Sequence, residues 1–261
     1  MKHITIKSAL IRTVAVILLT LGRISASAQY YMNVVQKDGE KVQYLVSNID
    51  SVYFSDQESP AVNYEYVDLG LSVKWASFNV GASKPEEYGD YFAWGETEAK
   101  SSYTWTNYKF RTSGDSYDNV KFSKYNTSSS YGTVDYKTTL DPEDDVAHVK
   151  WGGNWRMPTR AEQDELRANC TWTRTTLNGV NGYLVTSNKT GYTDRSIFLP
   201  AAGLRDDTDL YNVGRDGYCW SSSLGTDSPD SAWFIYFRSD YVFWYDYIGR
   251  GIGFSVRPVC P

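Results

Sequence analysis

Reactive side chains are scarce in this chain, and histidine is the scarcest of them. The two histidines are His3, inside an expected export signal, and His148. A Ser/His/Asp triad or a multi-histidine metal site would therefore have to be built around His148, and no residues with suitable spacing surround it. His148 falls late in a predicted helix, where a positive charge interacts favourably with the helix dipole. We interpret it as a structural residue.

Carboxylates are plentiful, with 31 aspartates and glutamates in the chain. Glycoside hydrolysis needs two carboxylates at a set distance in space rather than in sequence, so the sequence leaves a glycan-active enzyme open. The stretch 205–212 offers oxygen ligands for calcium, but it lacks the glycine and the terminal glutamate of an EF-hand loop. We favour a solvated loop there, and we expect no metal ion and no cofactor.

Three cysteines, Cys170, Cys219 and Cys260, allow at most one internal disulfide. Cys170 ends a predicted helix and Cys260 ends the last predicted strand, so these two are the preferred pair. Such a bridge would close a loop of about 90 residues and stabilise the fold by about 4 kcal/mol in the chain-entropy model. The alternative is that all three thiols are reduced.

The segment 241–247 carries aromatic side chains on both of its alternating faces. If Val242, Trp244 and Ile248 point inward, the other aromatic residues point outward and form an exposed patch of a kind that monomers seldom leave unused. The predicted ligand-binding residues are the outward aromatics and the charged residues at their rim, namely Arg238, Asp240, Tyr241, Phe243, Tyr245, Tyr247 and Arg250. The alternative is that these aromatics simply cover a twisted sheet.

Two helices and several short strands are expected to position that segment. One helix begins at Asp141 with Pro142 as its first residue, and the other follows Thr159, which forms a capping box with Glu162, and runs to about Asn169. Beyond residue 182, apolar or alternating runs predict strands at 183–186, 196–199, 232–238, 241–247 and 253–259. Helices segregated beside an antiparallel sheet define an α+β domain.

The chain is expected to contain four parts. Residues 1–28 combine a basic start, an apolar run and small residues at 26–28, which is the layout of a secretory signal peptide. Residues 29–56 form an N-terminal β segment whose Lys37-Asp38-Gly39 turn predicts a hairpin. Residues 57–63 are a linker, and residues 64–261 form one domain, within which 101–136 is a long irregular insertion.

Charge and hydropathy limit the possible partners. Removal of residues 1–28 takes away four of the 26 basic residues and none of the 31 acidic ones, which leaves a net charge of about −9. That charge opposes binding to nucleic acid, which depends on basic residues that pair with phosphates. The apolar run at 14–21 is shorter than the roughly 20 residues that span a bilayer. We expect no nucleic-acid partner, no membrane span, and a protein that is secreted or held at the cell surface.

Six segments carry a family resemblance: VDLGLSVKWA at 67–76, YGDYFAWGET at 88–97, WGGNWRMPT at 151–159, IFLPAAG at 197–203, YCWSSS at 218–223 and GFSVRPV at 253–259. In this order they resemble the Fibrobacter succinogenes major paralogous domain family, over residues 64–261. That resemblance implies a C-type-lectin-like fold, with two helices, a twisted antiparallel sheet and long loops. Bacterial adhesins, phage receptor-binding proteins and formylglycine-generating enzymes share this fold.

The resemblance also bears on the kind of function. Ligand-binding domains of this fold commonly use the region just before the final strand, and in some relatives this region is diversified; Cys219 is a further candidate for a variable position. Formylglycine-generating enzymes use two closely spaced cysteines near the C-terminal end, whereas Cys219 and Cys260 lie about 40 residues apart. The charged motif residues Asp90, Glu96 and Arg156 are interpreted as paired scaffold residues.

The expected function is therefore an exported ligand-binding or adhesion domain, not an enzyme, that recognises a glycan or a protein through the aromatic segment near the C-terminus. Two alternatives stay open. One is a secreted glycan-active enzyme. The other is a pilus-tip or surface-assembly subunit in which the hairpin at 31–54 mediates strand addition.

Overall fold

The computed structural model describes residues 31–35, 41–45, 64–225, 228–239, 241–245 and 248–261. By its contacts the chain divides into two units, residues 1–62 and 63–261. In the first unit, β1 (Tyr31–Val35) pairs antiparallel with β2 (Lys41–Leu45). The expected signal peptide, the hairpin turn and the linker lie outside the described residues.

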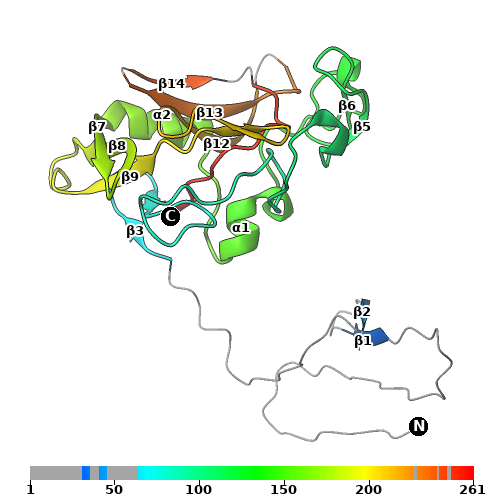
Figure 1. The fold of residues 1–261 in the computed structure, drawn as a ribbon, viewed down its shortest axis with the longest axis horizontal. Coiled ribbons are helices and arrows are strands. Elements are labelled where there is room, and N and C mark those ends of the chain that lie inside the picture. The colour runs from blue at the N-terminus through cyan, green and yellow to red at the C-terminus, as the bar shows by residue number, and fades with distance from the viewer. Residues whose placement is uncertain (1–30, 36–40, 46–63, 226–227, 240, 246–247) are drawn as a thin grey trace, which may run out of the picture. The chain divides into compact units, whose positions relative to one another are not determined.

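The second unit is built from small antiparallel sheets and two helices, so its class is α+β (Figure 1). The three-stranded sheets are β15-β4-β3, β7-β8-β9 and β12-β13-β14. Their strands are β3 (Tyr66–Val67), β4 (Lys74–Ala76), β7 (Cys170–Leu177), β8 (Val180–Ser187), β9 (Ser196–Pro200), β12 (Gly217–Leu224), β13 (Ala232–Arg238), β14 (Tyr241–Tyr245) and β15 (Val259–Cys260). Two hairpins are added, β5 (Arg111–Ser113) with β6 (Lys121–Phe122) and β10 (Leu204–Asp206) with β11 (Asp209–Tyr211).

The helix expected after Thr159 is confirmed as α2 (Arg160–Asn169). The Thr159 side chain accepts from the Glu162 amide, and the Glu162 carboxylate accepts from the Thr159 amide at 2.7 Å, so two of the open donors at the helix start are satisfied. Arg156 forms a two-pronged ion pair with the same carboxylate. The inner face of α2 buries Gln163 and Leu166.

The helix expected from Asp141 is divided in the structure, so the prediction of a continuous helix is wrong. A short 3-10 turn at Pro142–Asp144 is followed by α1 (Val146–Trp151). Asp145 separates the two because its backbone is extended while its carboxylate caps α1, accepting from the amides of Ala147 and His148. The same carboxylate accepts from the Met157 amide at 2.8 Å. Burial raises the pKa of Asp145.

The central strand β13 is buried on both faces, which explains its continuous apolar sequence. In β13, Phe234 and Tyr236 point into a large aromatic core that also contains Trp94 and Trp220. Phe237 points the opposite way, into a second core with Leu166 of α2. In Figure 1 the β12-β13-β14 sheet and α2 lie between the β7-β8-β9 sheet at one end of the unit and the β5–β6 hairpin at the other.

The strand expected at 253–259 is largely replaced by single bridges, and only Val259–Cys260 forms β15. Phe254 bridges to Phe92, Ser255 to Cys219, and Gly253 to Arg205. Because successive residues pair with different segments, this part of the chain ties the domain together without joining one sheet. Within the described residues, no helix is both long and apolar enough to cross a membrane.

The Cys170–Cys260 disulfide is not formed, and all three cysteines are free thiols. Cys170 pairs with Ser187 in the β7-β8-β9 sheet, whereas Cys260 pairs with Lys74 in the β15-β4-β3 sheet. The two cysteines proposed as a pair therefore belong to different sheets. Burial raises the pKa of Cys170 and of Cys219 to about 11, so both stay protonated at neutral pH.

Candidate functional site

The strongest candidate site lies on β14, the strand that lies within the predicted aromatic segment 241–247. Within the described residues β14 pairs only with β13, so it forms an edge of its sheet. Phe243 lies opposite Tyr236 on β13, and Tyr236 lies opposite Tyr218 on β12. Directly opposed side chains point to the same face of a sheet. The three rings therefore line up across three strands.

Tyr241 completes this line, and we call Tyr218, Tyr236, Tyr241 and Phe243 the aromatic row. Ring centroids are 4.9 Å apart from Tyr218 to Tyr236, 5.8 Å from Tyr236 to Tyr241 and 4.8 Å from Tyr241 to Phe243. These separations are typical of favourable aromatic contacts. The row begins at a buried ring and ends at Phe243, whose side chain is 43% exposed.

The outward aromatic face predicted from the sequence is thus only partly exposed. Tyr241 packs against the large core, although it keeps some surface. Val242, predicted to point inward, packs against the second core. Ile248, predicted to point inward with Val242, instead packs against the same core as Tyr241. Tyr241 and Val242 themselves contact different cores, so both faces of this strand meet a core, which alternation alone does not reveal.

Arg238 lies at the rim of the aromatic row, as predicted. It is exposed, it donates to the Tyr241 hydroxyl at 3.0 Å, and its guanidinium lies 4.9 Å from the centre of the Tyr241 ring. Asp240 and Tyr247 lie outside the described residues. Tyr245 belongs to β14, but its side chain also lies outside the described part.

Arg250 does not lie at the rim, which corrects the prediction. Its side chain is fully buried. It donates to the backbone carbonyls of Tyr125 at 2.7 Å and Lys124 at 3.1 Å, and its guanidinium lies 3.8 Å from the centre of the Phe122 ring. The chain turns inward after β14, so Arg250 binds the 101–136 insertion to the core. It cannot contact an external ligand.

Asp216, which is not among the predicted site residues, is hydrogen-bonded to two rings of the aromatic row. Its carboxylate is buried and accepts from the hydroxyls of Tyr236 at 3.2 Å and Tyr218 at 3.5 Å. Arg215 forms an ion pair with it at 3.1 Å. Burial raises the pKa of Tyr218 and of Tyr236, which keeps both hydroxyls protonated and able to donate. The Arg215-Asp216 pair just before the motif at 218–223 was the available signal.

The aromatic row is therefore suited to contact rather than to proton transfer. The Asp216 carboxylate is engaged by three donors and shielded from solvent. A general base must reach the proton that it abstracts. The groups left facing outward are ring surfaces and guanidinium groups, which are typical of binding sites.

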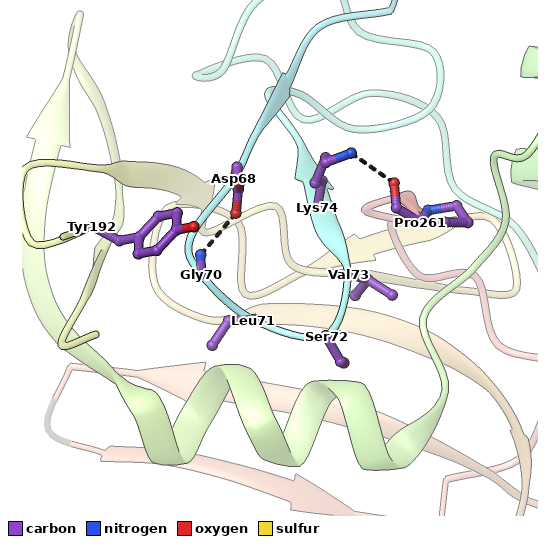
Figure 2. A pocket seen from close by; sticks show the side chains of 8 residues that line it. All are labelled: Asp68, Gly70, Leu71, Ser72, Val73, Lys74, Tyr192 and Pro261. Carbon is purple, nitrogen blue, oxygen red and sulfur yellow. Dashed lines mark hydrogen bonds between the residues drawn. The ribbon is translucent and has the colours of Figure 1, made fainter. Parts of the chain in front are cut away.

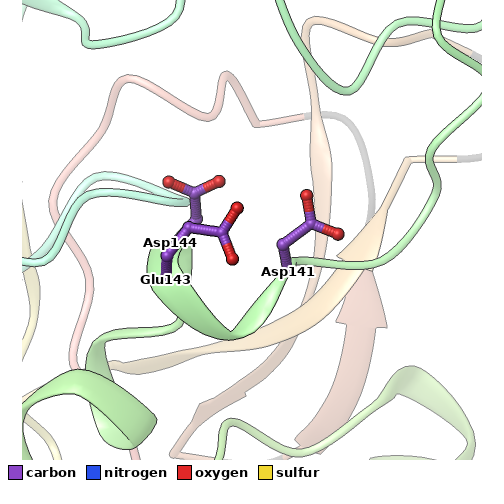
Figure 3. Close-up of side chains that lie close together, drawn as sticks. All are labelled: Asp141, Glu143 and Asp144. Carbon is purple, nitrogen blue, oxygen red and sulfur yellow. The ribbon is translucent and has the colours of Figure 1, made fainter. Parts of the chain in front are cut away.

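A second cluster contains Asp141, Glu143 and Asp144, whose carboxylates lie within 4.8 Å of one another (Figure 3). Lys124 already supplies the positive charge at this point. Its ammonium lies 2.7 Å from Asp141, 3.2 Å from Glu143 and 2.5 Å from Asp144. The cluster is thus an internal ion-pair network that anchors the insertion.

The lowered pKa of Asp144 makes the stability of the fold depend on pH. Burial raises its pKa, but hydrogen bonds from Lys109, Lys124 and Tyr125 outweigh burial, so the pKa lies below 3.8. The carboxylate therefore stabilises the fold above about pH 4, and this contribution is lost as the pH falls through the lowered value. Asp144→Asn is expected to lower the free energy of unfolding by about 2 kcal/mol at pH 7. At a pH below the lowered pKa the wild-type carboxyl is itself protonated, so the variant should lose no further stability there. Urea unfolding of wild type and variant, at pH 7 and at a pH below the lowered pKa of Asp144, measures the stability difference at each pH. A difference that is the same at both values would contradict the stabilising role of the ionised carboxylate.

A shallow pocket of about 210 Å³ lies beside β4 and is lined by Asp68, Gly70, Leu71, Ser72, Val73, Lys74, Tyr192 and Pro261 (Figure 2). Its polar groups are already engaged: Asp68 accepts from the Gly70 amide at 2.9 Å, and Lys74 donates to the Pro261 carbonyl at 2.9 Å. Ligand pockets usually exceed about 300 Å³. This pocket is a weaker candidate than the aromatic row.

The remaining sequence candidates have structural surroundings. His148 lies in the last turn of α1, with Nδ1 3.3 Å from the Trp155 carbonyl oxygen. The acidic stretch 205–212 forms the β10–β11 hairpin, in which Asp206 lies opposite Asp209. Of the motif charges, Glu96 pairs with Lys100 at 2.8 Å, and Arg156 pairs with Glu162. Cys219 is buried, with Ile235 opposite it, so it does not face the aromatic row.

No protein-family model, no curated protein and no solved structure matches the chain.

Proposed function

We propose that this chain is an exported ligand-binding or adhesion domain, secreted or held at the cell surface, that recognises a glycan or a protein through the aromatic row. The observation that carries the proposal is a line of four rings across an edge of the β12-β13-β14 sheet that ends at the exposed Phe243. Tyrosine and phenylalanine offer large rigid contact areas at low entropic cost. The proposal includes the export signal at residues 1–28.

A C-type-lectin-like fold is part of the proposal. Its support is the ordered set of six motifs together with an α+β unit of two helices, small antiparallel sheets and long connections. The motif residues have scaffold roles in the structure: Trp94 donates to the Ser221 carbonyl and Trp220 to the Phe92 carbonyl, so each tryptophan joins two motifs. In such a fold, the segment before the last strand is free to carry contacts.

Binding fits the aromatic row better than catalysis does. Among the described residues, the carboxylate bonded to the row is that of Asp216, which is buried and accepts from two tyrosine hydroxyls, and Cys219 faces away with its thiol protonated. An activated nucleophile needs an adjacent base or a lowered pKa. The row offers neither arrangement, whereas ring surfaces flanked by arginine are common at contact sites.

A binding array tests the proposal. Wild type and Tyr241→Ala/Phe243→Ala would be applied to immobilised glycans and to surface proteins. Loss of these two rings is expected to weaken binding about tenfold or more, as truncation of central aromatic contacts does. Tyr66→Ala is the matched control, because Tyr66 is 52% exposed on β3, in a different sheet.

The controls make the result decisive. Circular dichroism and thermal unfolding would establish that the double variant is folded, and Tyr66→Ala should bind as wild type does. If the double variant binds the same targets with unchanged affinity, the aromatic row is not the ligand site.

A further inference from the structure

Strand β7 forms an edge of the β7-β8-β9 sheet, which lies at the end of the unit opposite the β5–β6 hairpin (Figure 1). All eight of its residues pair with β8, from Cys170 opposite Ser187 to Leu177 opposite Val180, and the register does not shift. A two-residue turn joins the two strands. Because strands are usually about five or six residues long, β7 is a long and regular edge.

The register shows which backbone groups of β7 face outward. Since a two-residue turn closes the hairpin, Leu177 and Val180 form a hydrogen-bonded pair, and every second pair along the ladder does the same. The N–H and C=O groups of Trp172, Arg174 and Thr176 therefore point away from β8. Within the part of the chain that the structure describes, these outward groups have no hydrogen-bond partner.

The usual protection of an edge strand is missing from β7. Edge strands are often kept from pairing with another chain by short length, by lysine or proline, or by a β-bulge. The hairpin 170–187, every residue of which the structure describes, contains no lysine, no proline and no bulge. Its strand β7 is also rich in threonine, which favours β pairing. The edge is therefore suited to accept an added strand.

Charge favours a second copy of the chain at this edge. The chain has a net charge of −5, so two copies repel each other over most approaches. The hairpin 170–187 contains no acidic residue, and its one charged residue is Arg174. The Arg174 guanidinium donates to the backbone carbonyls of Arg215 at 3.1 Å and Gly214 at 3.4 Å. Two copies can thus meet edge to edge without placing acid against acid.

The sequence of β7 is complementary to itself when two copies run antiparallel with Thr173 opposite Thr173. Thr171 then lies opposite Thr175, so that threonine pairs with threonine along the whole exposed face of the strand. Directly opposed threonines stabilise a pair of strands. Trp172 lies opposite Arg174 in this register, and because both have outward backbone groups, the pair can exchange hydrogen bonds.

From these observations we propose that β7 binds β7 of a second copy of this chain, and that the two sheets join into one continuous antiparallel sheet about a two-fold axis at Thr173. The interface lies in a different sheet from the aromatic row, so the inference goes beyond the proposed function and does not depend on it. One pair of strands is a small interface, which predicts a reversible dimer with a dissociation constant of about 100 μM.

Sedimentation equilibrium over a range of protein concentrations tests for the dimer. The average mass is expected to rise toward twice that of the chain, and higher salt should strengthen association because it screens the repulsion between like-charged copies. Residue-resolved hydrogen exchange locates the contact. The amides of Trp172 and Arg174 should exchange more slowly as the concentration rises, whereas that of Thr173, which is already bonded to β8, should change little.

Exchange of charge at the two-fold axis tests the register. Thr173 is exposed, and in the dimer it faces its own copy, so Thr173→Lys and Thr173→Glu should each raise the dissociation constant about fivefold or more through like-charge repulsion. An equal mixture of the two variants should recover association, because lysine then faces glutamate. Thr112→Lys and Thr112→Glu are the matched controls, since Thr112 is an exposed threonine on β5, in a different sheet.

A proline variant tests the edge whatever its register. Thr176→Pro removes an outward N–H that β8 does not use, so it should weaken the dimer while circular dichroism and thermal unfolding show a folded monomer. Loss of association in this variant, together with recovery in the lysine and glutamate mixture, supports the proposal.

Three results would overturn the proposal. A chain that stays monomeric at several hundred micromolar, about the upper end of the expected range, has no such dimer. A dimer that none of the β7 variants weakens uses another surface. Weakening by both Thr173 variants without recovery in their mixture excludes the two-fold pairing at Thr173. Protection of the β7 amides only after another protein is added would assign the edge to a different partner.

Discussion

Arg250→Ala is expected to lower the free energy of unfolding by about 4 kcal/mol. The guanidinium satisfies two buried carbonyls, of Tyr125 and Lys124, and fills the space against the Phe122 ring. Removal leaves both oxygens without a donor, at about 1–3 kcal/mol each, and adds a cavity. Chemical denaturation followed by circular dichroism measures the loss.

Arg250→Ala is also expected to change hydrogen exchange in one part of the fold more than in another. Arg250 joins the C-terminal part of the chain to the 101–136 insertion, so backbone amides of β6 should exchange with solvent faster in the variant than those of α2. Arg250→Lys is the control, because lysine keeps the charge but lacks the planar fork that reaches both carbonyls. A stability loss of under about 1 kcal/mol for alanine, or equal exchange in both segments, would refute this role.

Trp220→Ala is expected to cost about 4 kcal/mol, the usual range for a fully buried tryptophan. Trp220 is fully buried, its ring stacks on Phe254 at 4.1 Å, and its indole N–H donates to the Phe92 carbonyl at 2.9 Å. The side chain thus joins β12 to two segments far away in sequence. Thermal and denaturant unfolding give the magnitude.

Comparison of Trp220→Phe with Trp220→Ala separates the contribution of the indole hydrogen bond from that of packing. Trp220→Phe keeps most of the apolar contact but loses the indole donor, so it should cost about 1–3 kcal/mol. Equal losses for phenylalanine and alanine would mean that the hydrogen bond, rather than packing, dominates at this position. Losses near zero for both would exclude Trp220 as a core residue.

Local signals predicted the local elements. The capping box of Thr159 and Glu162 fixed the start of α2, and the apolar run 232–238 coincides with β13. Both depend on residues close in sequence, where capping and alternation act directly. The division of the preceding helix at Asp145 was not predicted. It depends on a contact with a residue beyond the end of α1 in sequence, because the Asp145 carboxylate also accepts from the amide of Met157.

Features that depend on distant pairing could not be predicted. Residues 253–259 have the composition of a strand, yet their hydrogen bonds go to Phe92, Arg205 and Cys219 in turn. Arg250 was predicted to be a surface charge, but in the structure two carbonyls and an aromatic ring of the insertion surround its guanidinium. Sequence periodicity reports neither kind of partner.

The candidate site likewise combines residues that local sequence could predict with residues that only distant strand pairing brings in. The sequence selected β14 for its run of aromatics, and the structure places Phe243 at the surface. Asp216 and Tyr218 enter the site only through the register of β12, β13 and β14, which aligns rings that are far apart in sequence. Strand register was not predictable here, since β13 and β14 carry apolar or aromatic residues on both of their alternating faces.

The position of β14 at the edge of its sheet has an evolutionary consequence. Its backbone is held by β13, while Phe243 contributes little to either core and Tyr241 is only partly enclosed. Substitutions at surface positions usually change stability by no more than about 0.5 kcal/mol. New side chains can therefore be accepted at Phe243 without endangering the folded state, while the neighbouring Tyr241 and Val242 stay tied to the two cores.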